Sequence, residues 1–190
     1  METTIKDGTG KGFSAAVNSE NMVLTESLTI KQIAFESDRH GDAYVLNTGF
    51  VNLTNTAIQN QILYFKNTSG ENLFVEKIRV CGGLAMDVTM QCLVTANPTA
   101  GTIISDAVPA LKASLNLSSS NEFEGLAYLG GDGKTATGGY QLSNFQGHAP
   151  GHSIQEYDGA LILGRNDAVS ISVKPSAALS VCVEVICFVK

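Results

Sequence analysis

The residues whose types and spacing would suit catalysis are few in this chain of 190 residues. The three histidines, His40, His148 and His152, each lie in a turn-like segment beside a glycine. His148 and His152 are four residues apart, but Pro150 between them prevents the shared helix face that such spacing gives a metal site. Acidic residues at positions 156 and 158 leave a metal site there as a minor alternative to solvated loop residues.

Two groups of carboxylates have the spacing of a metal-binding site or of a pair of catalytic acids. Asp38, His40 and Asp42 alternate in a turn and would offer ligands to a hard cation, although a solvated turn explains them better. Glu122 and Glu124 point to one side of a predicted strand, as a glycosidase pair would, although the solvent-facing side of a strand is the simpler explanation. The sequence has no Gly-x-Ser-x-Gly elbow and no His-Glu-x-x-His motif. We therefore predict that the protein is not an enzyme and binds no cofactor or metal.

The composition favours a protein that assembles with other proteins. Hydrophobic residues make up 44% of the chain and charged residues only 16%, so Ser, Thr, Asn and Gly must supply most of the polar surface. A weakly charged surface costs little to desolvate against another protein. The net charge of −6 disfavours nucleic-acid and anionic-membrane partners. The opening residues lack the pattern of a signal peptide, and no apolar run is long enough to span a membrane.

The four cysteines form no Cys-x-x-Cys pair and no zinc-ligand spacing with a histidine. Each lies within an apolar strand pattern, at positions 81, 92, 182 and 187. This arrangement predicts reduced, buried thiols in a protein made in a cytosol.

The segment at 159–190 organises the predicted fold. Val169, Ile171 and Val173 alternate with polar residues, which indicates a strand with one solvent-facing side. Residues 179–189 are apolar on both sides apart from Glu184, which indicates a strand inside a sheet and covered on both faces. We therefore expect three strands joined by two tight connections, the last strand being central in a β-sandwich.

Alternating apolar residues and intervening turn residues predict further strands at short intervals, at 22–33, 43–53, 57–66, 73–80, 86–95 and 122–129. Turns are predicted at 38–42 and 67–71, one helical turn at 108–114, and an ordered loop at 145–151. This spacing of strands favours an all-β, antiparallel β-sandwich over an α/β fold.

Two glycine-rich segments, at 7–12 and 130–139, lack the strand and the spacing of a phosphate-binding loop. The first lies in a polar stretch without periodicity. We therefore expect an extended N-terminal arm at 1–20, whose glycines allow close approach to a neighbouring subunit. A single β-sandwich domain is expected at 21–190, long enough to bury a core without disulfide or metal staples.

Four segments carry a further signal: the run from Asp7 to Asn21, the strand-turn-strand at 57–80, the run from Leu115 to Gly139, and the closing hairpin at 159–189. Together they resemble a family of small virion proteins of tailed bacteriophages. The Asp-Gly-Thr-Gly run at 7–10 and the glycine-rich run at 131–139 are the more specific motifs, whereas the connection at 174–178 is shorter than the family's. The resemblance implies a jelly-roll-like structural protein of the phage particle, assembled in the host bacterial cytoplasm, without catalytic residues.

We therefore expect a capsid decoration (cement) protein that binds the head surface and stabilises neighbouring capsomers. A tail or baseplate module that binds host-surface glycan, through tyrosines at 44, 128, 140 and 157 and the glycine-rich loops, remains the alternative. The expected partners are the major capsid protein or other virion proteins, and further copies of the chain as a trimer or, second, a dimer. The residues expected to contact partners are Asp7, Gly8, Gly10, Lys11, Gly12 and Phe13 in the arm, and Asp132, Lys134, Tyr140 and Phe145 in the loops.

Overall fold

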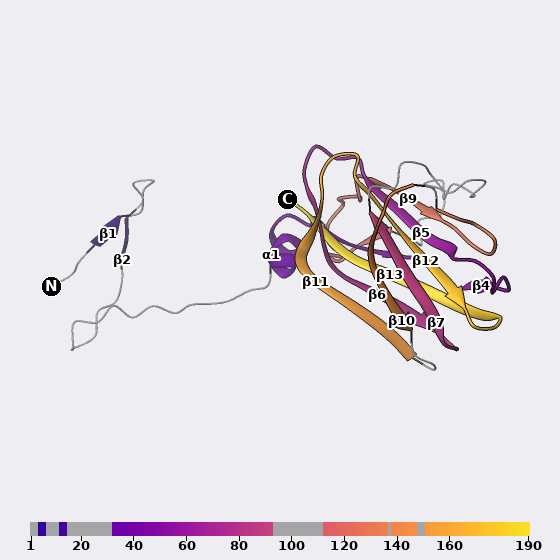
Figure 1. Cartoon of the computed structure of the whole chain (residues 1–190). Coiled ribbons are helices and arrows are strands. Elements are labelled where there is room, and N and C mark those ends of the chain that lie inside the picture. Colours follow the sequence, from indigo (N-terminus) through magenta and orange to yellow (C-terminus); the bar gives the residue numbers. More distant parts are fainter. Residues whose placement is uncertain (1–3, 7–11, 15–31, 93–111, 137, 148–150) are drawn as a thin grey trace. The chain divides into compact units, whose positions relative to one another are not determined.

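A computed structural model describes residues 4–6, 12–14, 32–92, 112–136, 138–147 and 151–190 (Figure 1). The chain divides into two compact units, residues 1–31 and residues 32–190. In the first unit, β1 (Thr4–Lys6) pairs antiparallel with β2 (Gly12–Ser14). The arm predicted at 1–20 is thus described only at these two short strands.

The described part of the second unit consists mainly of β-strands, with one short helix at its start. Its elements are α1 (Gln32–Arg39), β3 (Ala43–Asn47), β4 (Val51–Leu53), β5 (Asn60–Asn67), β6 (Leu73–Gly82), β7 (Met86–Cys92), β8 (Lys112–Ser114), β9 (Gly125–Leu129), β10 (Tyr140–Gly147), β11 (Gly151–Leu163), β12 (Ala168–Pro175) and β13 (Leu179–Val189). None of the helical residues that the structure describes forms a helix long and apolar enough to cross a membrane.

These strands form two antiparallel sheets that pack as a sandwich, which confirms the predicted fold class. The five-stranded sheet has the order β10-β7-β12-β5-β9. The six-stranded sheet has the order β11-β6-β13-β3-β8, and β4 also pairs with β13. The strand predicted to be central, β13 (yellow in Figure 1), therefore lies inside its sheet, between β6 and β3.

Strands near the start of the unit's sequence pair with strands near its end, and the next strands inward along the sequence pair in the same way. β3 pairs with β13, β5 with β12, β6 with β11, and β7 with β10. Successive pairs alternate between the two sheets. Four strands in the first half of the unit thus pair with four strands in its second half, in reverse order along the chain.

The core lies between the two sheets and is built from the alternate positions of their strands. Val75, Ile78 and Val80 of β6 are fully buried, and they face apolar side chains such as Met90 of β7 and Ile171 of β12. Burying a side chain of this size contributes about 1.5–3 kcal/mol. Because apolar residues recur at every second position, each sheet has one apolar side, and the apolar sides of the two sheets pack against each other.

The helix α1 was not predicted, and it contains residues 32 and 33, which were assigned to the end of a strand. Residues 22–31 of that predicted strand lie outside the described residues. Tertiary contacts with β3 and β13 stabilise this eight-residue helix. The helix ends at Arg39. Gly41, two residues later, has a φ of 75° that suits glycine, and its N–H donates to the Glu36 carbonyl at 2.8 Å.

Three other local predictions were wrong in part. Residues 112–114, assigned to a helical turn, form β8, and residues 145–147 and 151, assigned to a loop, belong to β10 and β11. The predicted solvent-facing side of β12 is exposed at Lys174 but buried at its other two positions, with Ser170 0% and Ser172 2% exposed. β12 lies in the middle of its sheet, and the Ser170 hydroxyl accepts a hydrogen bond from Gln61 Nε2 at 2.7 Å. A polar side chain is buried there because it has a partner.

Candidate interaction surface

The side of the six-stranded sheet that faces away from the core, here called the outer face, carries cross-strand rows of side chains. Residues opposite one another in antiparallel strands point to the same side, so the strand register defines each row. Across β11, β6 and β13, the rows are Ile162–Phe74–Phe188, Glu156–Lys77–Ile186, Ile154–Arg79–Glu184 and His152–Cys81–Cys182.

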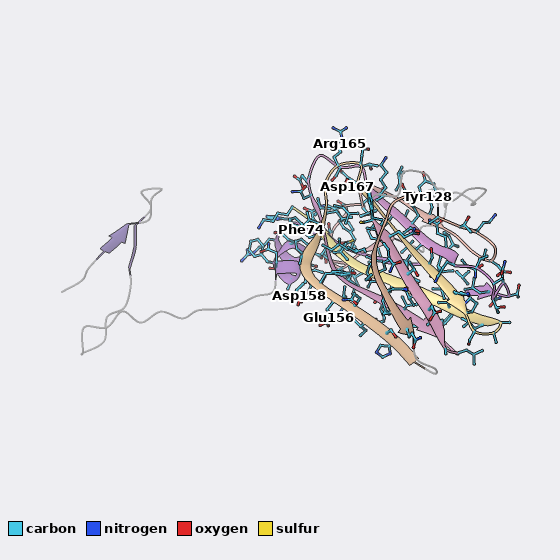
Figure 2. All side chains as sticks on the ribbon, in the orientation of Figure 1. Phe74, Tyr128, Glu156, Asp158, Arg165 and Asp167 are labelled. Atoms are coloured by element: carbon cyan, nitrogen blue, oxygen red, sulfur yellow. The ribbon has the colours of Figure 1, made fainter. Side chains whose placement is uncertain are left out.

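A bulge in β11 shapes one end of the outer face. The register between β11 and β6 shifts between Glu156 and Leu161, where Asp158 and Gly159 have φ of 48° and 77°. A Cβ on Gly159 would lie 3.6 Å from Phe188 Cζ, so the bulge lies against that ring. Phe188 in turn stacks on Phe74, with ring centroids 5.1 Å apart. Figure 2 shows Phe74, Asp158 and Glu156 along this side of the molecule.

The rest of the outer face mixes charged residues with apolar side chains that are only partly covered. Ile154 is 43% exposed and Ile162 50%, and Ile186 is half-buried. The charges between them are compensated, since Arg79 Nη1 lies 2.7 Å from Glu184 Oε1. We predicted that β13 is covered on both faces, but only its core side is fully buried. Exposed apolar side chains gathered on one face, with few net charges, are typical of a surface that binds another protein.

The predicted partner residue Asp132 instead makes contacts within the chain. Its carboxylate accepts hydrogen bonds from the Thr54 N–H at 2.8 Å, the Asn55 N–H at 2.7 Å and the Thr54 hydroxyl. These bonds, that of the Thr54 hydroxyl first, hold the pKa of Asp132 below its ordinary value. Asp132 therefore joins the glycine-rich loop to the connection that follows β4.

The glycine-rich loop at 130–139 is docked onto the start of β5 by its backbone. The carbonyl of Lys134, a second predicted partner residue, accepts from the Gln61 N–H at 2.7 Å, and Gly130 N–H donates to the Ile62 carbonyl at 2.8 Å. A Cβ on Gly130 would lie 1.7 Å from the Gln61 carbonyl oxygen, so only glycine fits this approach. The glycines thus serve internal packing at this end of the loop.

The remaining predicted contact residues have different positions. Tyr140 is 73% exposed at the start of the edge strand β10, whereas Phe145 is partly buried and packs against the core. Gly12 and Phe13 belong to β2. The other arm residues, Asp7, Gly8, Gly10 and Lys11, lie outside the described residues.

Some of the residues considered for catalysis, metal binding or sugar binding, namely Asp42, Tyr44, Glu122 and Glu124, line a separate acidic groove of about 950 Å³. The carboxylate of Glu71 lines it as well. Tyr44 lines the groove but is only 3% exposed. Its burial, and to a smaller extent the negative charge of Asp42, raises the pKa of its hydroxyl. Tyr128 is buried and Tyr157 half-buried, so among the four tyrosines considered for sugar stacking only Tyr140 is freely accessible.

The alternating residues at 38, 40 and 42 do not converge on a cation site. Asp38 pairs with Arg39 at 3.6 Å, and His40 Nδ1 lies 2.6 Å from Glu36 Oε2. Asp42 accepts hydrogen bonds from Tyr44 and Asn121. Within the described part of the chain, no three His, Cys, Asp or Glu side chains are grouped so that they would hold a metal ion.

No protein-family model, no curated protein and no solved structure matches this chain. The fold and the outer face are therefore the main physical basis for a functional proposal. Sequence reasoning missed the outer face, although the apolar second side of residues 179–189 was its one visible signal. That side was interpreted as covered, because the sequence does not show which strands flank it.

Proposed function

We propose that the protein is a structural, non-catalytic component of a tailed-phage particle that binds the head surface as a decoration (cement) protein. Its partner would be the major capsid protein, and bridging neighbouring capsomers would raise the free energy needed to separate them. The single observation that carries this proposal is the partly exposed apolar outer face around Ile154 and Ile162. Its apolar side chains would be covered by the capsid shell.

The proposal extends to the fold, which we infer to be a jelly roll. In a jelly roll, eight strands form one long antiparallel hairpin that is wound into two sheets. The nested pairs β3–β13, β5–β12, β6–β11 and β7–β10 agree with that arrangement, and β4, β8 and β9 are additions to it. Jelly rolls are common among viral capsid proteins, which supports a virion role by analogy of fold. A trimer on a three-fold lattice axis is the preferred assembly, and a dimer is second.

The outer face is tested by measuring how much protein binds to undecorated capsids. We expect Ile162→Glu to weaken binding at least about 10-fold, because a carboxylate replaces an apolar side chain that the interface would bury. Leu117→Glu is the matched control, because it also replaces an aliphatic side chain with a carboxylate. Leu117 is 94% exposed and lies in the loop after β8. Equal binding by both variants would refute this use of the outer face.

The N-terminal arm is tested with a chain that lacks residues 2–18. All residues of the main core cluster that the structure describes lie in the second unit, so we expect the sandwich to stay folded without residues 2–18. We expect reduced occupancy on capsids, and undiminished occupancy would count against a role for the arm in binding.

The acidic groove supports the second candidate, a tail or baseplate module that binds host-surface glycan. Its carboxylates and the neighbouring Ser120 and Asn121 are hydrogen-bonding partners for sugar hydroxyls. A glycan array with the purified protein separates the two proposals. Glycan binding that is lost in Glu122→Gln, together with no binding to capsids, would favour this candidate over the first.

A further inference from the structure

Two cysteines occupy neighbouring positions on the central strands of the outer face, at the end opposite the Phe74–Phe188 stack. Cys81 of β6 lies directly opposite Cys182 of β13, so their side chains point to the same side of the sheet. Both are free thiols and both are only half-buried, whereas Cys187 is fully buried. The prediction of buried thiols is therefore wrong for this pair, and small molecules can reach it.

The backbone hydrogen bonds of β13 define the geometry of this pair. Val183 donates its N–H to Thr48 Oγ1 at 2.9 Å, and its carbonyl accepts from the Thr48 N–H at 3.0 Å. The N–H and carbonyl groups of successive strand residues point to opposite edges, so those of Cys182 point to β6. Cys182 and Cys81 are thus a hydrogen-bonded pair, for which the Cα atoms lie about 5.5 Å apart. That separation falls within the range of about 4.4–6.8 Å that disulfides span, whereas the Cβ atoms of opposite residues lie about 4.5–5.5 Å apart and must close to about 3.5–4.5 Å for the bond to form.

The neighbours of the two thiols suit an oxidation reaction. Cys182 Sγ donates to Asn47 Oδ1 at 3.4 Å, so rotation about χ1 turns this thiol from Asn47 toward Cys81. Asn47 Oδ1 still accepts from the Gly49 N–H at 2.8 Å after that rotation. His152 of β11 lies opposite Cys81 on its other side, as a non-hydrogen-bonded pair with Cα atoms about 4.5 Å apart. Its side chain points to the same side of the sheet as the Cys81 thiol, so a change of rotamer can bring the imidazole to that thiol.

We propose that Cys81 and Cys182 form a dithiol site that low-molecular-weight disulfides such as glutathione disulfide oxidise to a cross-strand disulfide. The Cys81 thiolate attacks one sulfur of glutathione disulfide, breaks its S–S bond and releases one glutathione thiolate, which takes the proton from His152. Cys182 then attacks the Cys81 sulfur of the mixed disulfide and displaces the second glutathione, which takes the Cys182 proton. Two electrons pass from the protein sulfurs to glutathione, and one protein disulfide forms. This chemistry is independent of the proposed binding to capsids.

The site is tested by equilibrating the full chain with buffers of glutathione and its disulfide, followed by acid quenching, mass measurement and peptide mapping. We expect the loss of two thiols and about 2 Da without a glutathione adduct, and one cross-linked peptide pair containing Cys81 and Cys182. Because the bond closes a loop of about 100 residues, the oxidised protein should melt roughly 5–10 °C higher. Four remaining thiols in oxidising buffer, or a link to Cys92, would overturn the proposal.

Single variants separate the roles of the residues. Cys182→Ser should stop at a stable glutathione adduct on Cys81, whereas Cys92→Ser should form the disulfide as the native chain does. His152→Ala should slow oxidation about 10-fold without changing the final extent of disulfide formation. An unchanged rate in that variant would remove His152 from the mechanism, and a stable glutathione adduct on the native chain would refute the pair as a dithiol site.

Discussion

At the scale of single residues, Asp132 shows how a loop residue can be used within the chain. An exposed carboxylate in a glycine-rich loop suggested a contact with a partner, but its oxygens accept hydrogen bonds from Thr54 and Asn55. Nothing in the local sequence indicates this, because Thr54 is 78 positions away. The contact depends on how β4 and the loop after β9 meet in space.

We expect the contribution of Asp132 to stability to depend on pH. Its pKa is lowered in the folded protein, so the contribution is present above the ordinary aspartate pKa of about 3.9 and is lost as pH falls through the folded value. Asp132→Asn should therefore melt at a lower temperature than the native chain at pH 6, and the difference should shrink toward pH 3. Melting curves at both pH values check this, and an equal difference at both would contradict it.

At the scale of elements, α1 depends on one buried carboxylate. Glu36 is 1% exposed, and its carboxylate is hydrogen-bonded to the side chains of Gln32 and His40. Its Oε1 atom lies 4.0 Å from Lys190 Nζ. These contacts join the helix to the residue after β13. The charge of Glu36 is therefore compensated although it is buried.

Removing this carboxylate should destabilise the docked helix. We expect Glu36→Ala to lower the free energy of unfolding by about 1–3 kcal/mol, because it removes the hydrogen bonds that Gln32 and His40 make with a charged acceptor. The control is Asp38→Ala on the exposed side of the same helix. Urea unfolding measures both variants, and a similar loss in each would show that only helix propensity is affected.

The end of α1 gives a second test at this scale. Gly41 has a φ of 75°, and a Cβ there would lie 2.2 Å from Ser119 Oγ. We expect Gly41→Ala to cost about 1–3 kcal/mol of unfolding free energy, because both the backbone and the contact are strained. Gly70→Ala is the matched control, since no atom lies within 4 Å of its added Cβ. Equal unfolding midpoints for the two variants would contradict this account of the helix end.

The sequence predicted the elements with strong alternation and missed those that depend on tertiary contacts. β6, β7, β12 and β13 follow from apolar residues at every second position. The second half of β10 was taken as a loop because its residues are polar and have low strand propensity, and it is paired only on one edge. α1 is too short for its own propensity to identify it.

The candidate surface was harder to predict than the fold. Alternation shows which residues share a side of one strand, but it does not show which residues of neighbouring strands are opposite. That register depends on the shift in β11 between Glu156 and Leu161, and on a second shift in β13 between Ile186 and Cys187. The pairing of Cys81 with Cys182, 101 positions apart, therefore emerges only from the three-dimensional structure.

At the scale of the whole molecule, stability should be greatest in the middle of the two sheets. β13 pairs on both edges and has its core side fully buried, whereas β8 and β9 are paired only on one edge. Native-state hydrogen exchange should show amides of β13 exchanging at least about 10-fold more slowly than those of β9. Faster or equal exchange in β13 would indicate that the last strand is not integrated into a cooperative core.

The nested pairing has a consequence during synthesis on the ribosome. β13 is translated after β3, β4 and β6, the strands that it pairs with. A nascent chain that has not yet reached residue 179 thus has a vacant position between β6 and β3, with unpaired backbone groups on both sides. In the other sheet, β12 lies between β5 and β7 and pairs with both. These two strands therefore lack their shared partner until β12 is synthesised, late in elongation. Emergence of β12 and β13 from the ribosome, and not local hairpin formation, is then the step that closes the sandwich.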